Sequence, residues 1–355
     1  MFARFFPLRA WVIEGFGGVE KLSLSDIPEP AAGESEVVVD VKVAGVNPVD
    51  RSTLLGRFDW IRPPFVTGAE FAGVISSVGG GVRGLSAGTR VLVNPKLFCG
   101  SCYYCLRGEE SACLSNERMN RAPHIIGVSR QGGWRQKAEV PAMNILPIPE
   151  GLPTAEVCTL GVDGATAWHI VKRSRPEPGE FVLVVGSTGG VGMFAVQIAK
   201  MYGCEVAAVV GSSEHAKKMK QLGADHAINR KDQNVVEEVR KLTNNRGADI
   251  VIDPLGSATF EMSSSSLAPL GRYATCGTLT GTKTELSLLH LYSMQVEYIG
   301  STTFSRADLN DALNALARGK LIPQIDSKFR FDELPAAMRR LDEHGRFGKV
   351  LVEMA

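Results

Sequence analysis

The sequence predicts an α/β protein that combines a β-rich domain with a doubly wound parallel sheet. Up to about residue 140, short β-branched runs such as residues 37–43 and 90–93 are separated by Gly and Pro, which is typical of strands joined by long loops. After Pro178, strand and helix patterns alternate, and this alternation predicts parallel strands with helices on both faces. The length of 355 residues suggests two or more domains.

The expected elements follow these patterns along the chain. The first expected strand covers residues 11–13. The second region should contain, in order, the strand 181–185, the helix 191–202, the strand 205–210, the helix 214–222 and the strands 249–253 and 271–276. From about Thr302 the chain returns to a helix, the strand 324–331, a helix and the strand 349–353. We expect the serine tract 263–266 to lie on the exposed face of a helix.

The composition is that of an ordinary soluble enzyme. The formal net charge of +1 gives no reason to expect a nucleic acid or a membrane surface as partner. No apolar run reaches the roughly 18 residues of a membrane span. Residues 1–10 are too short, and too interrupted by Pro7, to form a signal sequence. We therefore expect a cytoplasmic protein with a short N-terminal extension.

Four cysteines form the strongest motif of the chain. They follow the spacing Cys-x2-Cys-x2-Cys-x7-Cys within a turn-rich segment: Cys99, Cys102, Cys105 and Cys113. This spacing suits tetrahedral thiolate coordination of Zn²⁺, and four thiolates leave no open position for substrate, so we predict one structural zinc per chain. The alternative is a pair of disulfides or free thiols, but two-residue gaps strain a disulfide.

The three remaining cysteines, Cys158, Cys204 and Cys276, are isolated in apolar runs. We expect them to be small buried hydrophobic residues.

A glycine-rich run follows the strand expected at 181–185. It consists of Gly186, Ser187, Thr188, Gly189, Gly190, Val191 and Gly192. Glycines in this position let the backbone turn sharply and approach a pyrophosphate, which is held by the N–H groups at the start of the next helix. Since the run lies between a strand and a helix, it predicts a dinucleotide-binding site.

The second strand of this unit suggests which dinucleotide is bound. NAD-specific sites carry an acidic residue about 20 residues beyond the glycines, but here the strand ends without one before Glu214. Ser212, Lys217 and Arg230 could instead supply a hydroxyl group and positive charge to a 2′-phosphate, which favours NADP(H) over NAD(H). The alternative for Lys217 is a solvated helix face.

These motifs together resemble the medium-chain dehydrogenase/reductase superfamily. Besides the cysteine and glycine motifs, the resemblance includes Gly-Ala-Glu-Phe-Ala-Gly at 68–73, Gly-Ala-Thr-Ala-Trp at 164–168 and Phe-Gly-Lys-Val at 347–350. It implies a GroES-like catalytic domain formed by residues 1–163 and 302–355, with a zinc lobe at about 94–116. It also implies a Rossmann coenzyme domain at 164–301, and a dimer or tetramer that pairs through the strand 296–300.

The chain departs from the zinc alcohol dehydrogenase branch at the positions that hold the catalytic metal. By the resemblance, these positions are Asn47, Ala69 and Val162, and the proton-relay hydroxyl position falls on Val49. An amide, a methyl and an isopropyl group are poor zinc ligands. The run 45–50 is similar to quinone oxidoreductases instead, and the combination with a zinc lobe is similar to acryloyl-CoA reductases. A metal site built from Asp50, Glu70 and Asp163 is an alternative.

Without a Lewis acid, reduction of an isolated ketone loses several kcal/mol of transition-state stabilisation, whereas a conjugated acceptor spreads the charge into an enolate. We therefore expect an NADP(H)-dependent reductase of enones or quinones. The resemblance suggests Asn47 as hydrogen-bond donor to the oxyanion and Thr166 as support for the nicotinamide. Lys349 could pair with Glu70 or Asp50, or bind the pyrophosphate. Two alternatives are a zinc-free reductase of hydrophobic or aromatic ketones, and an NADP(H)-binding sensor with little catalysis.

Overall fold

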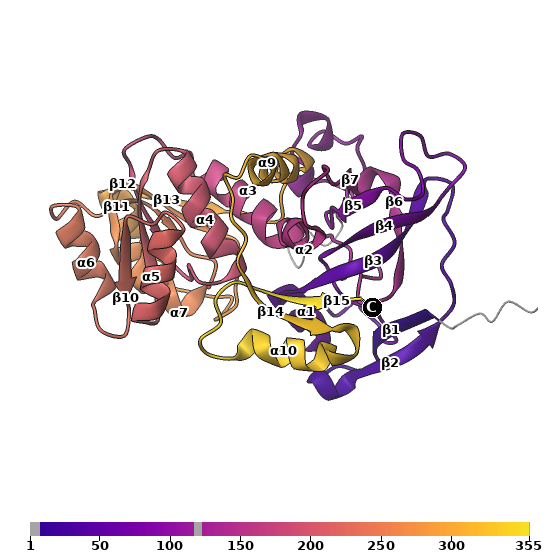
Figure 1. Ribbon diagram of the computed structural model, residues 1–355. Helices are drawn as coiled ribbons and strands as arrows, with labels where there is room; N and C mark the ends of the chain where they lie inside the picture. Colours follow the sequence, from indigo (N-terminus) through magenta and orange to yellow (C-terminus); the bar gives the residue numbers. More distant parts are fainter. Residues whose placement is uncertain (1–7, 117–122, 355) are drawn as a thin grey trace, which may run out of the picture. The chain divides into compact units, whose positions relative to one another are not determined.

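The computed structural model describes residues 8–116 and 123–354, which form two compact units. The first unit combines the chain up to Val162 with Ile325–His344 and the segment from Lys349 onwards, and the second contains Asp163–Gln324 and Gly345–Gly348. Figure 1 shows the elements of both units along the chain. Residues 1–7 of the predicted N-terminal extension lie outside the described residues. Residues 8–10 belong to the first strand, Leu8–Ile13, which begins earlier than the predicted residue 11.

The first unit is built mainly of strands, as predicted. β1 (Leu8–Ile13) and β2 (Leu22–Ile27) form an antiparallel pair. A seven-stranded sheet has the order β14-β15-β3-β4-β5-β7, with β6 paired to β3. Its strands are β3 (Glu36–Val46), β4 (Phe71–Val78), β5 (Arg90–Val93), β6 (Lys137–Pro141), β7 (Ile145–Pro147), β14 (Ile325–Arg330) and β15 (Lys349–Glu353). The helices of this unit are α1 (Pro48–Leu54), α2 (Thr154–Cys158) and α10 (Leu334–Asp342).

The C-terminal strand completes this sheet and its core. β15 pairs antiparallel with β3, with Val350 opposite Val46. Val350 and Val352 pack in the same buried cluster as Phe71 and Trp134. Because of this register, Lys349 at the start of β15 lies beside the end of β3, where α1 begins.

The second unit has the predicted doubly wound parallel sheet. All its strand pairs are parallel, in the order β10-β9-β8-β11-β12-β13. The strands are β8 (Phe181–Val184), β9 (Glu205–Val210), β10 (His226–Asn229), β11 (Ala248–Ile252), β12 (Leu267–Thr275) and β13 (Glu297–Gly300). The helices are α3 (Ala165–Arg173), α4 (Gly190–Met201), α5 (Ser213–Gln221), α6 (Val235–Leu242), α7 (Ser257–Ser265), α8 (Leu288–Met294) and α9 (Arg306–Ala317).

The division between the units differs from the predicted boundary at 301/302. The coenzyme unit continues to Gln324, because α9 packs against α3. The buried Asp308 on α9 lies 2.7 Å from Nδ1 of His169 on α3, and accepts hydrogen bonds from Ser305. Although burial would raise the pKa of Asp308, these hydrogen bonds hold it well below its usual range. This pairing ties residues 302–324 to the second unit.

The serine tract differs from its predicted exposure. Ser263, Ser264 and Ser266 are buried on the inner side of α7 and its C-terminal end. Ser263 donates a hydrogen bond to Asp253 over 2.7 Å, and the hydroxyl groups of Ser264 and Tyr298 lie 2.7 Å apart. Hydrogen bonding therefore allows these small polar residues to pack inside the unit.

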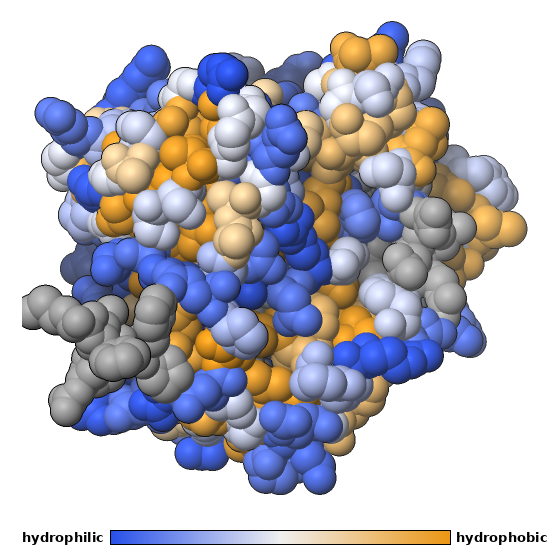
Figure 2. Space-filling model, turned by 90° about the vertical axis from the view of Figure 1, so that its right-hand side faces the viewer, coloured by the Kyte–Doolittle hydropathy of each residue, from blue (hydrophilic) through white to orange (hydrophobic). Residues whose placement is uncertain are grey.

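No helix of the described residues has both the length and the apolar character needed to cross a membrane. In the face shown in Figure 2, hydrophilic residues are interspersed with apolar ones.

Candidate functional site

The four motif cysteines converge on one point. Their sulfur atoms all lie within 4.8 Å of one another, and they are the one group of three or more His, Cys, Asp or Glu side chains in the described residues that could hold a metal ion. The Cys99 sulfur lies 3.6 Å from that of Cys113 and 3.9 Å from that of Cys105. Zn–S bonds of about 2.3 Å place tetrahedral sulfurs about 3.8 Å apart, so the cluster fits Zn²⁺. These separations are far longer than a disulfide bond of about 2.05 Å.

The surroundings of the sulfurs also suit a metal ion. Backbone hydrogen bonds from Ser101 and Cys102 lower the pKa of Cys99 to about 6, whereas burial raises the pKa of Cys105 to about 12. A bound cation would therefore be needed to keep all four sulfurs deprotonated at neutral pH. The zinc would supply this charge and crosslink the loops of the lobe.

The remaining cysteines show no sign of redox chemistry. Cys158 and Cys204 are buried, and Cys276 is partly buried. Burial raises the pKa of Cys204 to about 11 and that of Cys276 to about 12. The thiol form is unreactive, which agrees with their predicted role as packing residues.

The glycine motif has the geometry of a dinucleotide cradle. Gly186 follows β8 with a φ of +64°, and a Cβ on Gly192 would lie 2.3 Å from the carbonyl oxygen of Gly186. A Cβ on Gly190 would lie 1.7 Å from Oδ2 of Asp163. The turn thus requires glycine at these positions. The N-cap of α4, Gly189, provides no side-chain cap, so the first N–H groups of α4 are available for a phosphate.

The non-glycine residues of the motif are partly structural. The buried Ser187 donates a hydrogen bond from Oγ to the carbonyl of Val209 over 2.7 Å, and this bond joins the turn to β9. The Thr188 carbonyl accepts a hydrogen bond from Gly348 over 3.0 Å. Val191 lies in the first turn of α4.

Two of the three predicted 2′-phosphate residues lie together at the end of β9. Ser212 is the N-cap of α5, where its Oγ accepts the N–H of His215 over 3.2 Å. The backbone N–H of Arg230 donates a hydrogen bond to the carbonyl of Val210 on β9. The Arg230 side chain lies close to Gly211, because a Cβ atom added to this glycine would be 3.9 Å from Nη2. Lys217 is exposed further along α5. The end of this strand therefore carries a guanidinium group beside a helix N-terminus.

A buried charged network occupies the place where β3, β4 and β15 meet. The Lys349 ammonium lies 2.5 Å from Oε2 of Glu70, and donates to Oδ1 of Asn47 over 2.5 Å. Nδ2 of Asn47 donates to the same carboxylate over 3.3 Å, and the backbone N–H of Val162 donates to its other oxygen over 2.7 Å. The side chains of Lys349, Glu70 and Asn47 are all buried. Lys349 therefore forms the predicted pair with Glu70, and its binding of a pyrophosphate stays a prediction.

Donor and acceptor chemistry fixes the orientation of the Asn47 amide. An ammonium only donates and a carboxylate only accepts, so Oδ1 must face Lys349 and Nδ2 must face Glu70. Glycine at position 45 makes room for this network, because a Cβ there would lie 2.0 Å from Oε2 of Glu70 and 2.9 Å from Cε of Lys349. No local sequence pattern indicates this role of Gly45, since the contact depends on residues far away in the chain.

Asp50 organises the loop next to this network. Its carboxylate accepts backbone N–H groups of Asn47 and Ala69 over 2.9 Å each, and it forms a capping box at the start of α1. Burial raises the pKa of Asp50 to about 6, against the opposing effects of these hydrogen bonds and the charge of Lys349. Its contacts are those of a structural residue.

The other two positions predicted to lack metal ligands lie in an apolar cluster. Ala69 is fully buried there with Phe58, Ile61, Ile125 and Val128, and Val162 and Trp60 pack against them. Methyl and isopropyl groups offer no lone pair to a cation. Of the groups at this place that could coordinate a metal ion, the amide of Asn47 is already hydrogen bonded and the carboxylate of Glu70 is already paired with an ammonium.

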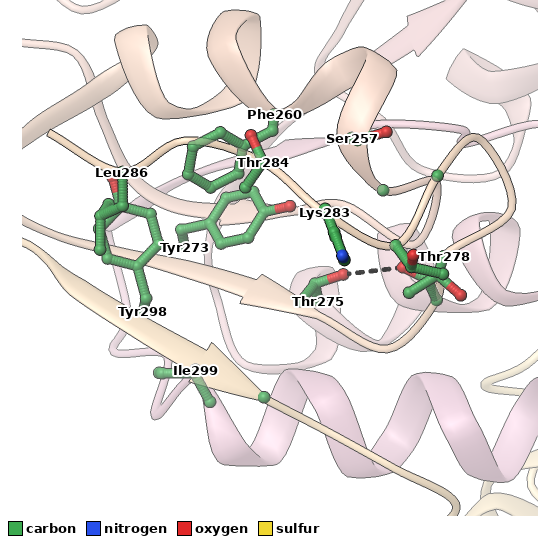
Figure 3. Close-up of a pocket in the computed structure, with 15 residues that line it drawn as sticks. Ser257, Phe260, Tyr273, Thr275, Thr278, Lys283, Thr284, Leu286, Tyr298 and Ile299 are labelled. Carbon is green, nitrogen blue, oxygen red and sulfur yellow. Dashed lines mark hydrogen bonds between the residues drawn. The ribbon is translucent and has the colours of Figure 1, made fainter. Parts of the chain in front are cut away.

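A cavity of about 300 Å³ lies at the carboxyl ends of β12 and β13 (Figure 3). The rings of Phe260, Tyr273 and Tyr298, with centroids 5.3–5.6 Å apart, gather at one end, and Thr275 and Lys283 lie toward the other. Ligands of doubly wound sheets bind at the carboxyl ends of strands. No sequence motif predicts this cavity, because the residues that line it come from separate segments of the chain. Thr166 lies in the first turn of α3 in the same unit.

Comparisons with known proteins extend over both units. The family described as alcohol dehydrogenase GroES-like domain matches residues 33–150, and the family described as zinc-binding dehydrogenase matches residues 190–318. A protein named NAD-dependent alcohol dehydrogenase from Sulfolobus acidocaldarius is 33% identical, over 98% of this chain and 100% of that protein. An acryloyl-coenzyme A reductase from Sulfurisphaera tokodaii is 29% identical, over 95% of this chain and 98% of that protein.

Solved structures are similar over the same extent. The cobalt- and zinc-bound thermostable alcohol dehydrogenase from Pyrobaculum aerophilum has a TM-score of 0.89 and 36% identity, over 98% of this chain and 100% of that chain. The GroES-like unit and the doubly wound unit are thus both found in a single related chain.

Proposed function

Because the chain belongs to the medium-chain dehydrogenase/reductase superfamily and is a nicotinamide-dependent oxidoreductase, we propose a specific reaction for it. It reduces conjugated carbonyl compounds or quinones with NADPH and without a catalytic metal. The observation that carries this proposal is the donor set around Glu70. Ala69 and Val162 have no ligand atoms, and Asn47 is hydrogen bonded to Lys349 and Glu70.

The absence of ligand side chains decides which acceptors suit the site. Reduction of an isolated ketone concentrates negative charge on one oxygen, which a metal ion normally stabilises. Hydride addition to an enone or quinone distributes the charge over a conjugated system, which hydrogen bonds can stabilise. The reduced nicotinamide supplies the hydride. The names of the acryloyl-CoA reductases among the relatives agree with a conjugated acceptor.

In this proposal, Asn47 is the donor for the developing oxyanion and Thr166 supports the nicotinamide. Lys349 withdraws electron density from the Asn47 amide through Oδ1, and such a charged partner strengthens the N–H of the same amide as a donor. Glu70 accepts a hydrogen bond from one of the two hydrogens on Nδ2 of Asn47. This contact sets the direction in which the second hydrogen points. The Asn47 side chain is fully buried, so bulk water does not compete for this amide.

The first test compares 2-cyclohexenone with cyclohexanone, which differ only in the conjugated double bond. We expect NADPH oxidation with the enone at least about 100-fold faster in kcat/KM, since removing conjugation costs about 3 kcal/mol or more of transition-state stabilisation. Zinc content is measured in the same preparation and is expected to be about one per chain. Efficient oxidation of simple alcohols by protein that holds about two zinc ions per chain would contradict the proposal.

A second candidate function is the zinc-free reduction of hydrophobic or aromatic ketones. The apolar side chains around Ala69, including Phe58 and Trp60, favour it, as do the names of the alcohol dehydrogenase relatives. Turnover of acetophenone at a rate comparable to that of 2-cyclohexenone would identify this candidate. NADPH binding without turnover of either compound would identify the nucleotide-binding alternative.

We further propose that NADPH is preferred over NADH, although several relatives are named NAD-dependent. The Arg230→Ala variant is expected to lose about 10–100-fold in kcat/KM for NADPH with little change for NADH, because a charge-assisted hydrogen bond to the 2′-phosphate is removed. Steady-state kinetics with both coenzymes measures this ratio. The neighbouring exposed Lys231→Ala is the matched control. If the ratio of kcat/KM for NADPH to kcat/KM for NADH is unchanged in Arg230→Ala, the guanidinium does not contribute to coenzyme specificity.

We also propose that two chains pair through the β13 edge of the coenzyme unit. Among the described strands, β13 pairs with β12 alone; α8, which precedes β13 in the chain and contacts β12, has no buried residue and exposes Leu289 and Tyr292 at 63% and 70%. An unpaired edge next to exposed apolar side chains suits a second copy. The double variant Leu289→Arg/Tyr292→Arg should sediment as a monomer, whereas Leu106→Arg, at an exposed position of the first unit, should not change the assembly. A monomeric wild-type protein would refute this pairing.

A further inference from the structure

The cavity at the carboxyl ends of β12 and β13 is separate from the dinucleotide cradle. Leu255 lies between the two places. Its side chain faces the glycine motif, since a Cβ on Gly186 would lie 3.1 Å from it, and its carbonyl accepts the N–H of Thr280 over 2.8 Å on the other side. The residues that line the cavity include none of the glycine motif 186–192 and none at the end of β9. The coenzyme unit therefore has a second hollow beside the cradle.

The rim of this cavity is formed by two loops that meet without room for side chains. A Cβ on Gly277 would lie 2.1 Å from the carbonyl oxygen of Pro254, and one on Gly281 would lie 1.9 Å from Oγ of Ser257. Gly256 has a φ of +105°, and a Cβ on it would lie 2.7 Å from the carbonyl oxygen of Gly281. Ser257 also donates a hydrogen bond to the carbonyl of the opposite loop over 3.1 Å. These contacts fix the two loops to each other, so the rim is a built feature of the unit.

Three aromatic rings form the apolar end of the cavity (Figure 3). Phe260 meets Tyr273 edge to face at an interplanar angle of 78°, and stacks on Tyr298 at 30°. Tyr273 is buried, whereas Phe260 and Tyr298 are only partly buried and still line the cavity. Aromatic clusters of this kind bind a further flat ring by edge or face contacts.

The other end of the cavity carries positive charge. Lys283 is exposed and is the one charged side chain among the described residues that line the cavity. No ion pair with an N–O distance up to 4.0 Å within residues 8–116 and 123–354 includes it. In Figure 3 the hydroxyl group of Tyr273 is directed toward the end where Lys283 and Thr275 lie. Burial raises the pKa of Tyr273, so its phenol keeps its proton and can donate to an acceptor in the cavity.

We propose that this cavity is a binding site for a small aromatic carboxylate. The ring of the ligand lies among Phe260, Tyr273 and Tyr298, and its carboxylate meets the ammonium of Lys283. The volume of about 300 Å³ is at the lower end for small-molecule sites, so it suits a ligand with a single substituted ring. Since the site uses none of the residues of the cradle, the ligand and the coenzyme bind at the same time. The proposal does not depend on which substrate the enzyme reduces.

The test is isothermal titration calorimetry with phenylacetate, using the full chain in a saturating concentration of either reduced coenzyme. We expect about one site per chain with a Kd of about 0.01–1 mM. Phenylacetamide has the same ring without the charge and should bind at least about fivefold more weakly. Lys283→Met should weaken the binding of phenylacetate about 5–30-fold and leave that of phenylacetamide nearly unchanged, because a charge-assisted contact is lost. Lys283→Arg keeps the charge and should bind phenylacetate within about threefold of the wild type.

Lys320→Met is the matched control, because it removes another exposed lysine of the same unit, and it should bind phenylacetate like the wild type. Thr284→Trp, at an exposed position that lines the cavity, fills it with an indole and should abolish binding. Wild-type affinity in Lys283→Met would overturn the proposal. Loss of phenylacetate binding when the coenzyme is added would assign the cavity to the coenzyme and would also overturn it.

A second copy of the chain is the other occupant that the same assay separates. If the wild type does not bind phenylacetate but the double variant Leu289→Arg/Tyr292→Arg does, a second copy covers the cavity and the proposal is wrong. Absence of binding in both proteins also refutes it.

Discussion

The Lys349→Met variant is expected to lose about 3–5 kcal/mol of stability in the GroES-like unit. The substitution leaves the Glu70 carboxylate buried at 0% exposure without its cation, and it removes the donor to Asn47. The expected fall in melting temperature is roughly 6–20 °C, measured by differential scanning calorimetry. Since the amide of Asn47 also loses its orientation, kcat with an enone should fall more than KM rises.

The loss of stability in Lys349→Met should depend on pH. Burial already raises the pKa of Asp50 to about 6, and Lys349 acts against this rise, so the pKa of Asp50 should be higher still in the variant. An acid whose pKa is raised on folding costs stability above that pKa, and the cost disappears as the pH falls toward its unfolded value of about 3.9. The deficit should therefore be larger at about pH 8 than at about pH 5.

Lys328→Met is the matched control for this prediction. Lys328 pairs with Glu353 across β14 and β15 over 2.8 Å, and both side chains are nearly half exposed. Loss of such a surface pair is expected to cost no more than about 1 kcal/mol. A similar small effect for Lys349→Met would mean that the buried pair does not stabilise the unit. Lys349→Arg should restore most of the stability, because it keeps the charge.

The Cys113→Ser variant should lose its structural zinc. Cys113 is fully buried and its sulfur lies close to those of Cys99 and Cys102, at 3.6 and 4.0 Å. With a hydroxyl in place of one thiolate, zinc content is expected to fall from about one per chain to less than about 0.2, since structural sites need all four ligands. Elemental analysis after dialysis measures the metal, and limited proteolysis should cut within the lobe.

The control for the zinc prediction is Cys204→Ala, which removes a cysteine buried in the other unit. This variant should keep about one zinc per chain. Cys113→Ser should still bind NADPH, because its coenzyme unit forms a separate compact unit with its own core. Full zinc retention by Cys113→Ser would mean that the four cysteines are not the site.

Features with short spacing could be predicted from the sequence. The fold class, the alternation of strands and helices in the coenzyme unit and the convergence of the four cysteines are all encoded in local patterns. The cysteines lie within 15 residues, so turns alone bring their sulfurs together. The glycine motif also follows from its immediate neighbours, because a strand, a tight turn and a helix leave room for no side chain at Gly192.

Features that depend on distant parts of the chain could not be derived in this way. Helix α9 belongs to the coenzyme unit because Asp308 bonds to His169, 139 residues earlier, whereas the family resemblance implies a boundary before this helix. The serine tract is buried because Asp253 and Tyr298 offer hydrogen-bond partners, and hydropathy alone does not reveal partners.

By itself, the sequence determined the two-unit architecture, the cluster of four cysteines, the glycine-rich turn between a strand and a helix, and the residue types at positions 47, 69 and 162, which are not metal ligands. Only the tertiary structure decided what takes their place. Lys349 meets Asn47, 302 residues away, because β15 pairs with β3 in the register that sets Val350 against Val46. Local patterns record turns and periodicity, whereas the pairing of charges depends on strand register, which arises from packing of the whole sheet.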